Sequence, residues 1–119
     1  MKELPFAELT RNQEAFRGQI VRVRANLHND AGYKTLYALG AKMEGETLLS
    51  EFTDLSSYAA CDGVEQILHE VAGINNWFDG SASVVVIGRM GTLDHFRRNQ
   101  FGFEMLCVEQ AASVGASLP

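Results

Sequence analysis

The sequence predicts a mainly β domain with one or two helices. Three observations support this fold class: several segments alternate apolar and polar residues, clusters of turn-forming residues separate them, and one stretch near the middle has helical periodicity. The chain has 119 residues, of which 46% are hydrophobic and 21% charged, a composition typical of a folded globular protein. We therefore expect a single domain over residues 1–119.

The chain begins with a predicted helical lead-in over residues 1–18. Thr10 to Asn12 are expected to interrupt the helix, and Gly18 can end it in a left-handed conformation. Three apolar residues fall roughly on one helical face: Phe6, Leu9 and Phe16.

Three strands are predicted next, over residues 19–27, 33–39 and 47–53. Residues 28–32 are rich in turn formers and predict a hairpin loop, and a turn is predicted at residues 44–46. In the first strand, four apolar residues alternate with polar ones: Val21, Val23, Ala25 and Leu27. This period of two indicates one buried face and one face in water.

The middle of the chain predicts an amphipathic helix over residues 62–72. Asp62 and Glu65 have the spacing of a capping box, and Gly73 is well placed to end the helix. Apolar residues recur at the spacing of one helical face: Val64, Ile67, Leu68 and Val71.

Two more strands are predicted after this helix. The first covers residues 82–93 and opens with a run of apolar residues, which indicates cover on both faces. Gly88 and Gly91 within it suggest a bulge or a bend. A polar loop over residues 94–102 leads to the last strand, over residues 103–110.

Five strands with a helix between the third and the fourth is the element order of the OB-fold, a partly open Greek-key barrel. We therefore expect a five-stranded OB-like Greek-key barrel, with the helix of residues 62–72 closing one end and a flexible tail over residues 111–119. The alternative is an open antiparallel α+β sheet with the helix on one face.

Residues 9–27 and 84–89 resemble a small bacterial OB-fold-like domain family of unassigned function. The family pattern is a short helix, an Asn-Pro-x-x-Tyr-x-Gly-Lys turn and a Val-x-Val-x-Gly strand. The matching residues here are Asn12, Gly18, Val21, Val23, Val84, Val86, Gly88 and Arg89. Four residues depart from the pattern, which has Pro, Tyr, Lys and Gly where this chain has Gln13, Phe16, Gln19 and Ala25. The resemblance implies the fold and assigns no activity.

Charge and composition narrow the class of partner and the compartment. The net charge is -5, which makes binding of duplex nucleic acid unfavourable. We find no apolar stretch of the length needed for a secretory signal or for a membrane span. We therefore expect a cytoplasmic protein that does not engage a membrane, and the sequence leaves export open as the alternative. Cys61 and Cys107 are predicted to be buried, and the sequence leaves open whether they form a disulfide.

The sequence contains no motif that predicts catalysis, a metal or a cofactor. His28 with Asp30 and Asp94 with His95 are the combinations that could hold a metal or move a proton, yet the histidines lack metal-ligand spacing. A Gly-x-Ser-x-Gly turn and a phosphate loop are both absent. We therefore expect no catalytic residue, no bound metal and no cofactor.

A candidate ligand-binding surface is predicted from the strand order. In an OB-fold, the loop between the fourth and fifth strands flanks the ligand face. This loop, the first strand and the fourth strand together carry arginines for charge and phenylalanines for stacking. The predicted ligand-binding residues are Arg22, Arg24, Arg89, Phe96, Arg97, Arg98 and Phe101.

The expected function is that of a non-catalytic binding module of unknown ligand. An anionic ligand or a short single-stranded nucleic acid fits the arginine distribution. The alternative is a structural or protein-interaction domain that acts as a homodimer, because Met105 to Val108 place apolar residues on both faces of the last strand. An enzyme using the histidines is the least favoured of the three.

Overall fold

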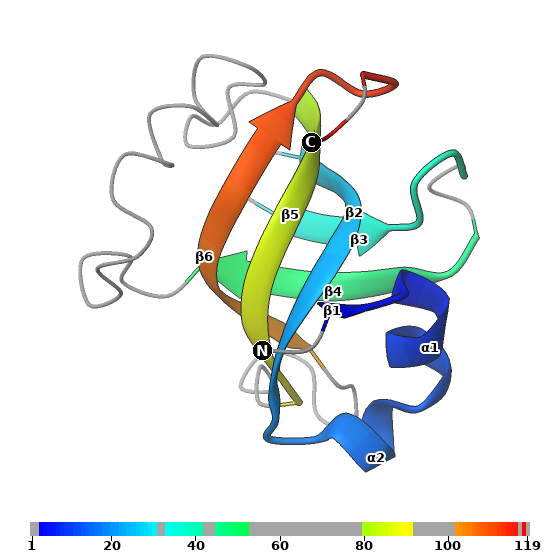
Figure 1. Cartoon of the computed structure of the whole chain (residues 1–119), viewed down its shortest axis with the longest axis vertical. Coiled ribbons are helices and arrows are strands. Elements are labelled where there is room, and N and C mark those ends of the chain that lie inside the picture. Colours follow the sequence, from blue (N-terminus) through cyan, green and yellow to red (C-terminus); the bar gives the residue numbers. More distant parts are fainter. Residues whose placement is uncertain are drawn as a thin grey trace.

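The described part of the chain consists of six strands and two short helices (Figure 1). It comprises residues 3–30, 33–41, 45–52, 80–91, 102–116 and 118 of a computed structural model. The elements, in chain order, are β1 (Glu3–Leu4), α1 (Phe6–Arg11), α2 (Gln13–Phe16), β2 (Ile20–Asp30), β3 (Tyr33–Tyr37), β4 (Thr47–Phe52), β5 (Gly80–Met90) and β6 (Phe103–Ala112). The protein is therefore mainly β, as predicted.

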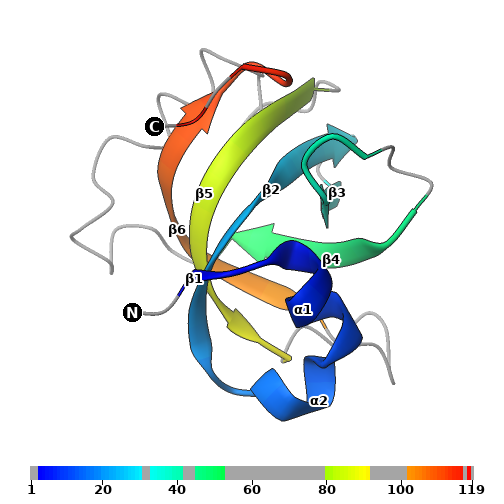
Figure 2. The same ribbon diagram turned by 45° about the vertical axis from the view of Figure 1, so that its right-hand side comes forward.

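All six strands belong to one sheet in the order β1-β2-β3-β4-β6-β5. Because β2 also pairs with β5, the sheet closes partly into a ring (Figures 1 and 2). The β4–β6 pair is parallel, whereas β2–β3, β3–β4, β5–β6 and β2–β5 are antiparallel. β1 adds a short parallel strand to β2 and was not predicted, because two residues are too few to show a period.

β2 is longer than predicted, because residues with turn propensity at its end are part of the strand. Residues 28–30 were expected in a hairpin loop, but they continue the strand to Asp30. These residues pair with β3 on one side, and His28 and Asn29 also pair with the start of β5 on the other. Backbone hydrogen bonds to two neighbouring strands outweigh the weak preference of Asn and Asp for turns.

The remaining strands agree with the predicted ones to within three residues at their ends, as element boundaries usually do. β5 begins at Gly80, two residues before the predicted strand, and ends at Met90. β6 continues to Ala112, so the first two residues of the predicted flexible tail, Ala111 and Ala112, are strand residues paired with β5. The predicted helix of residues 62–72 lies outside the described residues, as do residues 94–101 of the predicted loop.

The helical lead-in is confirmed as two short helices separated at Asn12, whose backbone has φ -126° and ψ 40°. Phe6 and Leu9 of α1 are buried in the hydrophobic core. Gly18 follows α2 with a φ of 78°, and its backbone N–H donates to the carbonyl oxygen of Met90 at 2.7 Å. The lead-in is thus attached to the ring through apolar packing and through this hydrogen bond.

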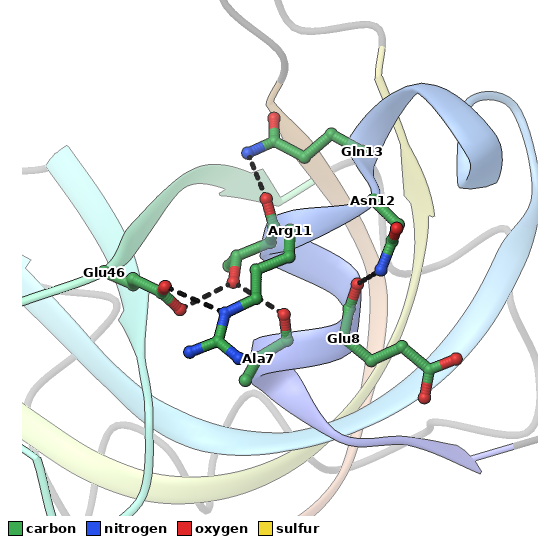
Figure 3. A network of polar contacts seen from close by, with 7 residues as sticks. Ala7, Glu8, Arg11, Asn12, Gln13 and Glu46 are labelled. Atoms are coloured by element: carbon green, nitrogen blue, oxygen red, sulfur yellow. Dashed lines mark hydrogen bonds and ion pairs between the residues drawn. The ribbon is translucent and has the colours of Figure 1, made fainter.

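A polar contact also connects α1 to the residue before β4 (Figure 3). The hydroxyl of Thr10 donates to Oε2 of Glu46 at 3.0 Å, and Nε of Arg11 donates to Oε1 at 3.2 Å. The hydrogen bond from Thr10, followed by that from Arg11, holds the pKa of Glu46 below its ordinary value of 4.5. The Glu46 carboxylate therefore joins two segments that are far apart in sequence.

The core lies inside the ring, and β5 is buried on both of its faces. Val84 and Val86 point inward and are fully buried, while Val85 and Ile87 on the opposite face are 3% and 4% exposed. The prediction of a strand covered on both sides is therefore confirmed. The predicted irregularity near Gly88 is also confirmed, since the register with β6 shifts between Ile87 and Gly88. Gly91 directly after β5 has a φ of 99°.

Cys107 on β6 is fully buried and forms a disulfide. The other cysteine of the sequence, Cys61, lies outside the described residues. Over the described ranges, neither helix has the length and apolar character needed to cross a membrane.

Candidate ligand-binding face

Three of the predicted ligand-binding residues lie together on one face of the sheet. Arg22 and Arg24 alternate along β2 with Val21 and Val23, which are buried in the core, so both arginines lie on the outer face. Arg89 of β5 pairs with Ile20, the residue two positions before Arg22 on the same face. Arg22 and Arg89 are therefore diagonal neighbours, with Cα atoms about 7–8 Å apart.

Each of these arginines pairs with a glutamate on a strand other than its own. Arg22 pairs with Glu109 of β6 through two hydrogen bonds, in which Nε donates to Oε1 and Nη2 donates to Oε2 at 3.1 Å. Nε of Arg24 donates to Oε2 of Glu3 in β1 at 3.0 Å. Nη1 of Arg89 lies 3.9 Å from Oε2 of Glu104, its register partner in β6.

In each of these three ion pairs the carboxylate offsets the charge of its arginine. We call this surface the arginine–glutamate face and define it by Arg22, Arg24, Arg89, Glu3, Glu104 and Glu109. The arginines occupy the two central strands, β2 and β5, and the glutamates lie on the flanking strands, β1 and β6. The side chains are between 20% and 42% exposed, so both charges of every pair can be reached from solvent.

The four other predicted ligand-binding residues are Phe96, Arg97, Arg98 and Phe101, and they lie outside the described residues. The three glutamates were missed by sequence reasoning. The alternation of Glu104 between Phe103 and Met105 could have placed it on the outer face. No such alternation identifies Glu109. The β5–β6 register skips this residue between Val86 and Val85, so the simple alternation of the two faces breaks there.

Two polar pairs continue the outer face along β2 and β5. Ser83 donates to Oδ1 of Asn26 at 2.7 Å, and both residues are 2% exposed. One pair further along, the Ser81 hydroxyl and Nδ1 of His28 are 2.6 Å apart and half-buried. Each pair joins direct register partners of the β2–β5 ladder. Sequence reasoning did not single out either serine.

The structure describes one of the two predicted histidine and carboxylate combinations, His28 with Asp30. His28 contacts Ser81, and Asp30 is exposed at the end of β2. Asp94 and His95 lie outside the described residues. Within the described ranges, no three His, Cys, Asp or Glu side chains gather in a way that could hold a metal ion.

Most of the apolar residues that suggested a homodimer are covered within one chain, whereas Leu106 is half-buried. Val85 and Ile87 on β5 are nearly inaccessible, and Met105, Cys107 and Val108 on β6 are fully buried. Burial of these side chains therefore does not require a second copy.

Comparison of the chain with protein-family models, with curated proteins and with solved structures finds no match. The fold and the arginine–glutamate face therefore carry the functional argument.

Proposed function

We propose that the chain is a non-catalytic, OB-like binding module. The pairing order supports an OB-like Greek-key barrel, because β2 to β6 form a five-membered ring in which β6 returns beside β4 and β5 closes on β2. The helix that an OB-fold has between its third and fourth strands would fall between β4 and β5, where residues 62–72 have helical periodicity. Binding through one face is the common use of this fold.

The proposed ligand is anionic, such as a short single-stranded nucleic acid. The observation that carries this proposal is the alignment of Arg22, Arg24 and Arg89 on one face of two neighbouring strands. Guanidinium groups bind phosphate and carboxylate groups through paired hydrogen bonds. The sequence offers Arg97 and Arg98 as further charge and Phe96 and Phe101 as rings on which bases stack.

The test is titration of a fluorescent oligothymidylate of about 12 nucleotides at about 50 and 200 mM salt. Wild-type protein is expected to bind more weakly at the higher salt concentration. The double variant R22A/R24A should lose roughly tenfold in affinity, and its salt dependence should fall by about 1.4 in log–log slope. The matched control R11A/R17A removes the same charge from the helical lead-in and should bind like wild type.

The anionic-ligand proposal fails if the wild type shows no binding at either salt concentration. It also fails if R22A/R24A and R11A/R17A weaken binding equally, because the effect would then report net charge alone. Circular dichroism and thermal unfolding of each variant would show whether the fold is retained.

The disulfide of Cys107 supports a compartment other than the expected cytoplasm. Disulfides persist in oxidising environments and are rare in the cytosol, where thiols are kept reduced. Cys107 is fully buried and disulfide-bonded. We therefore propose an oxidising compartment as the place where the protein acts. Detection of the oxidised form in protein taken directly from its native cells would test this.

A further inference from the structure

We propose that Glu3, Glu104 and Glu109 are specificity-determining residues of the arginine–glutamate face, which occupy its arginines and thereby weaken the binding of polyanions. This inference rests on the proposed function, because it concerns the same face. It adds a ligand requirement: an anionic group must replace a carboxylate at each arginine that it contacts.

The contact between Arg22 and Glu109 shows this occupation most clearly. Two nitrogens of the Arg22 guanidinium donate to the two carboxylate oxygens of Glu109. A phosphate group that binds an arginine in the bidentate manner uses the same donors. Glu109 therefore already fills the position that a phosphate of the ligand would take at Arg22.

The strands hold the three carboxylates in place around the arginines. Glu104 is the register partner of Arg89, and Glu3 is the register partner of Arg22 although its carboxylate contacts Arg24. Glu109 is the residue that the β5–β6 register skips between Val86 and Val85. The pairing of these strands therefore keeps the three carboxylates beside the arginines.

Occupation by carboxylates changes the energetics of anion binding. A free arginine row attracts a polyanion and gains from the release of its condensed counterions. On this face, binding instead exchanges one anion for another, and the displaced glutamates repel the ligand. A polyanion therefore gains less on this face than on a row of arginines alone. A short ligand whose anionic groups match the arginine positions replaces the carboxylates most favourably.

The test compares two triple variants that change the net charge equally. E3Q/E104Q/E109Q removes the three carboxylates of the face but keeps side chains of the same size. E8Q/E14Q/D30N removes three exposed carboxylates elsewhere, on the helical lead-in and at the far end of β2. Both variants change the formal net charge from -5 to -2, because each removes three negative charges. Asp30 lies six residues beyond Arg24 along β2, about 20 Å away.

The probe is oligothymidylate of about 12 nucleotides, titrated at several salt concentrations. The E3Q/E104Q/E109Q variant should bind roughly tenfold more tightly than the control variant. Its log–log salt slope should be steeper by up to about 2, because the three glutamates no longer compete with phosphate at the arginines. The inference is overturned if the two triple variants bind equally, since net charge would then explain the whole gain.

The outcomes separate this inference from the proposed function. If the wild type does not bind the oligonucleotide but E3Q/E104Q/E109Q does, the glutamates exclude polyanions and the proposed anionic function fails. If the wild type binds and the glutamine variant is no tighter than its control, the proposed function stands and the inference fails. Unfolding curves for all variants verify that each is folded.

Discussion

Gly88 of β5 lies directly against the aromatic ring of Phe103 in β6. A Cβ atom placed on Gly88 would lie 2.4 Å from both Cε2 and Cζ of Phe103, and 2.6 Å from the carbonyl oxygen of Glu104. These distances are well below van der Waals contact, so a residue with a side chain does not fit at position 88. Phe103 is fully buried, and the absence of a side chain at Gly88 leaves the space that its ring occupies.

We predict that Gly88→Ala destabilises the protein by about 3 kcal/mol, because both the ring and a backbone carbonyl must move. Urea unfolding monitored by circular dichroism measures this cost. Gly115→Ala is the control for backbone strain alone, since Gly115 has a φ of 89° and open space around it. The control should cost about 1 kcal/mol. A cost for Gly88→Ala no larger than the control would contradict the steric explanation.

Glu46 is predicted to make stability depend on pH in the acid range. The Thr10 hydroxyl and then Arg11 hold the folded-state pKa of Glu46 below 4.5. A group whose pKa is lowered by folding stabilises the folded state above its unfolded pKa, and this contribution is lost as the pH falls through the lowered pKa. Glu46→Gln should therefore lower the urea midpoint slightly at pH 7, and the difference from wild type should disappear well below pH 4.5.

Glu8→Gln is the control for the Glu46 prediction. Glu8 is an exposed glutamate in the first turn of the same helix, α1. This variant should unfold like wild type throughout the pH range. An equal effect of both substitutions would show that the contact between α1 and Glu46 contributes nothing specific.

The sequence predicted the features that depend on local periodicity. The alternation of Arg22 and Arg24 with valines placed both arginines on the outer face of β2, and the apolar run of β5 indicated burial on both faces. Features that depend on distant pairing were not predictable. Glu109 is 87 residues from Arg22, and no local pattern links them. Residues 28–30 have turn propensity, but pairing on both sides makes them strand.

The buried pair of Asn26 and Ser83 is predicted to matter more for stability than the neighbouring pair of His28 and Ser81. Ser83→Ala would leave Oδ1 of Asn26 without the hydroxyl that donates to it at a site only 2% exposed. Losing a partner in a buried site costs about 1–3 kcal/mol. Ser81→Ala should cost less than about 1 kcal/mol, because water can replace its hydroxyl at the half-buried His28.

Chemical denaturation of the two serine variants checks this order directly, since both substitutions remove one hydroxyl from the same face of β5. Equal costs, or a larger cost for Ser81→Ala, would show that exposure does not determine the value of these hydrogen bonds.

The disulfide of Cys107 predicts that the unreduced protein has no titratable thiol. This should hold even after the protein is unfolded in denaturant without reductant. Thiol titration with a chromogenic disulfide reagent measures this, and the reduced protein serves as the positive control with two thiols per chain. Reduction should lower the free energy of unfolding by about 2–5 kcal/mol, because the unfolded chain regains conformational freedom. The prediction is contradicted if the unreduced protein has two reactive thiols, or if reduction leaves the unfolding midpoint unchanged. Cys107 would then be only a buried side chain on β6, and an oxidising compartment would have no support.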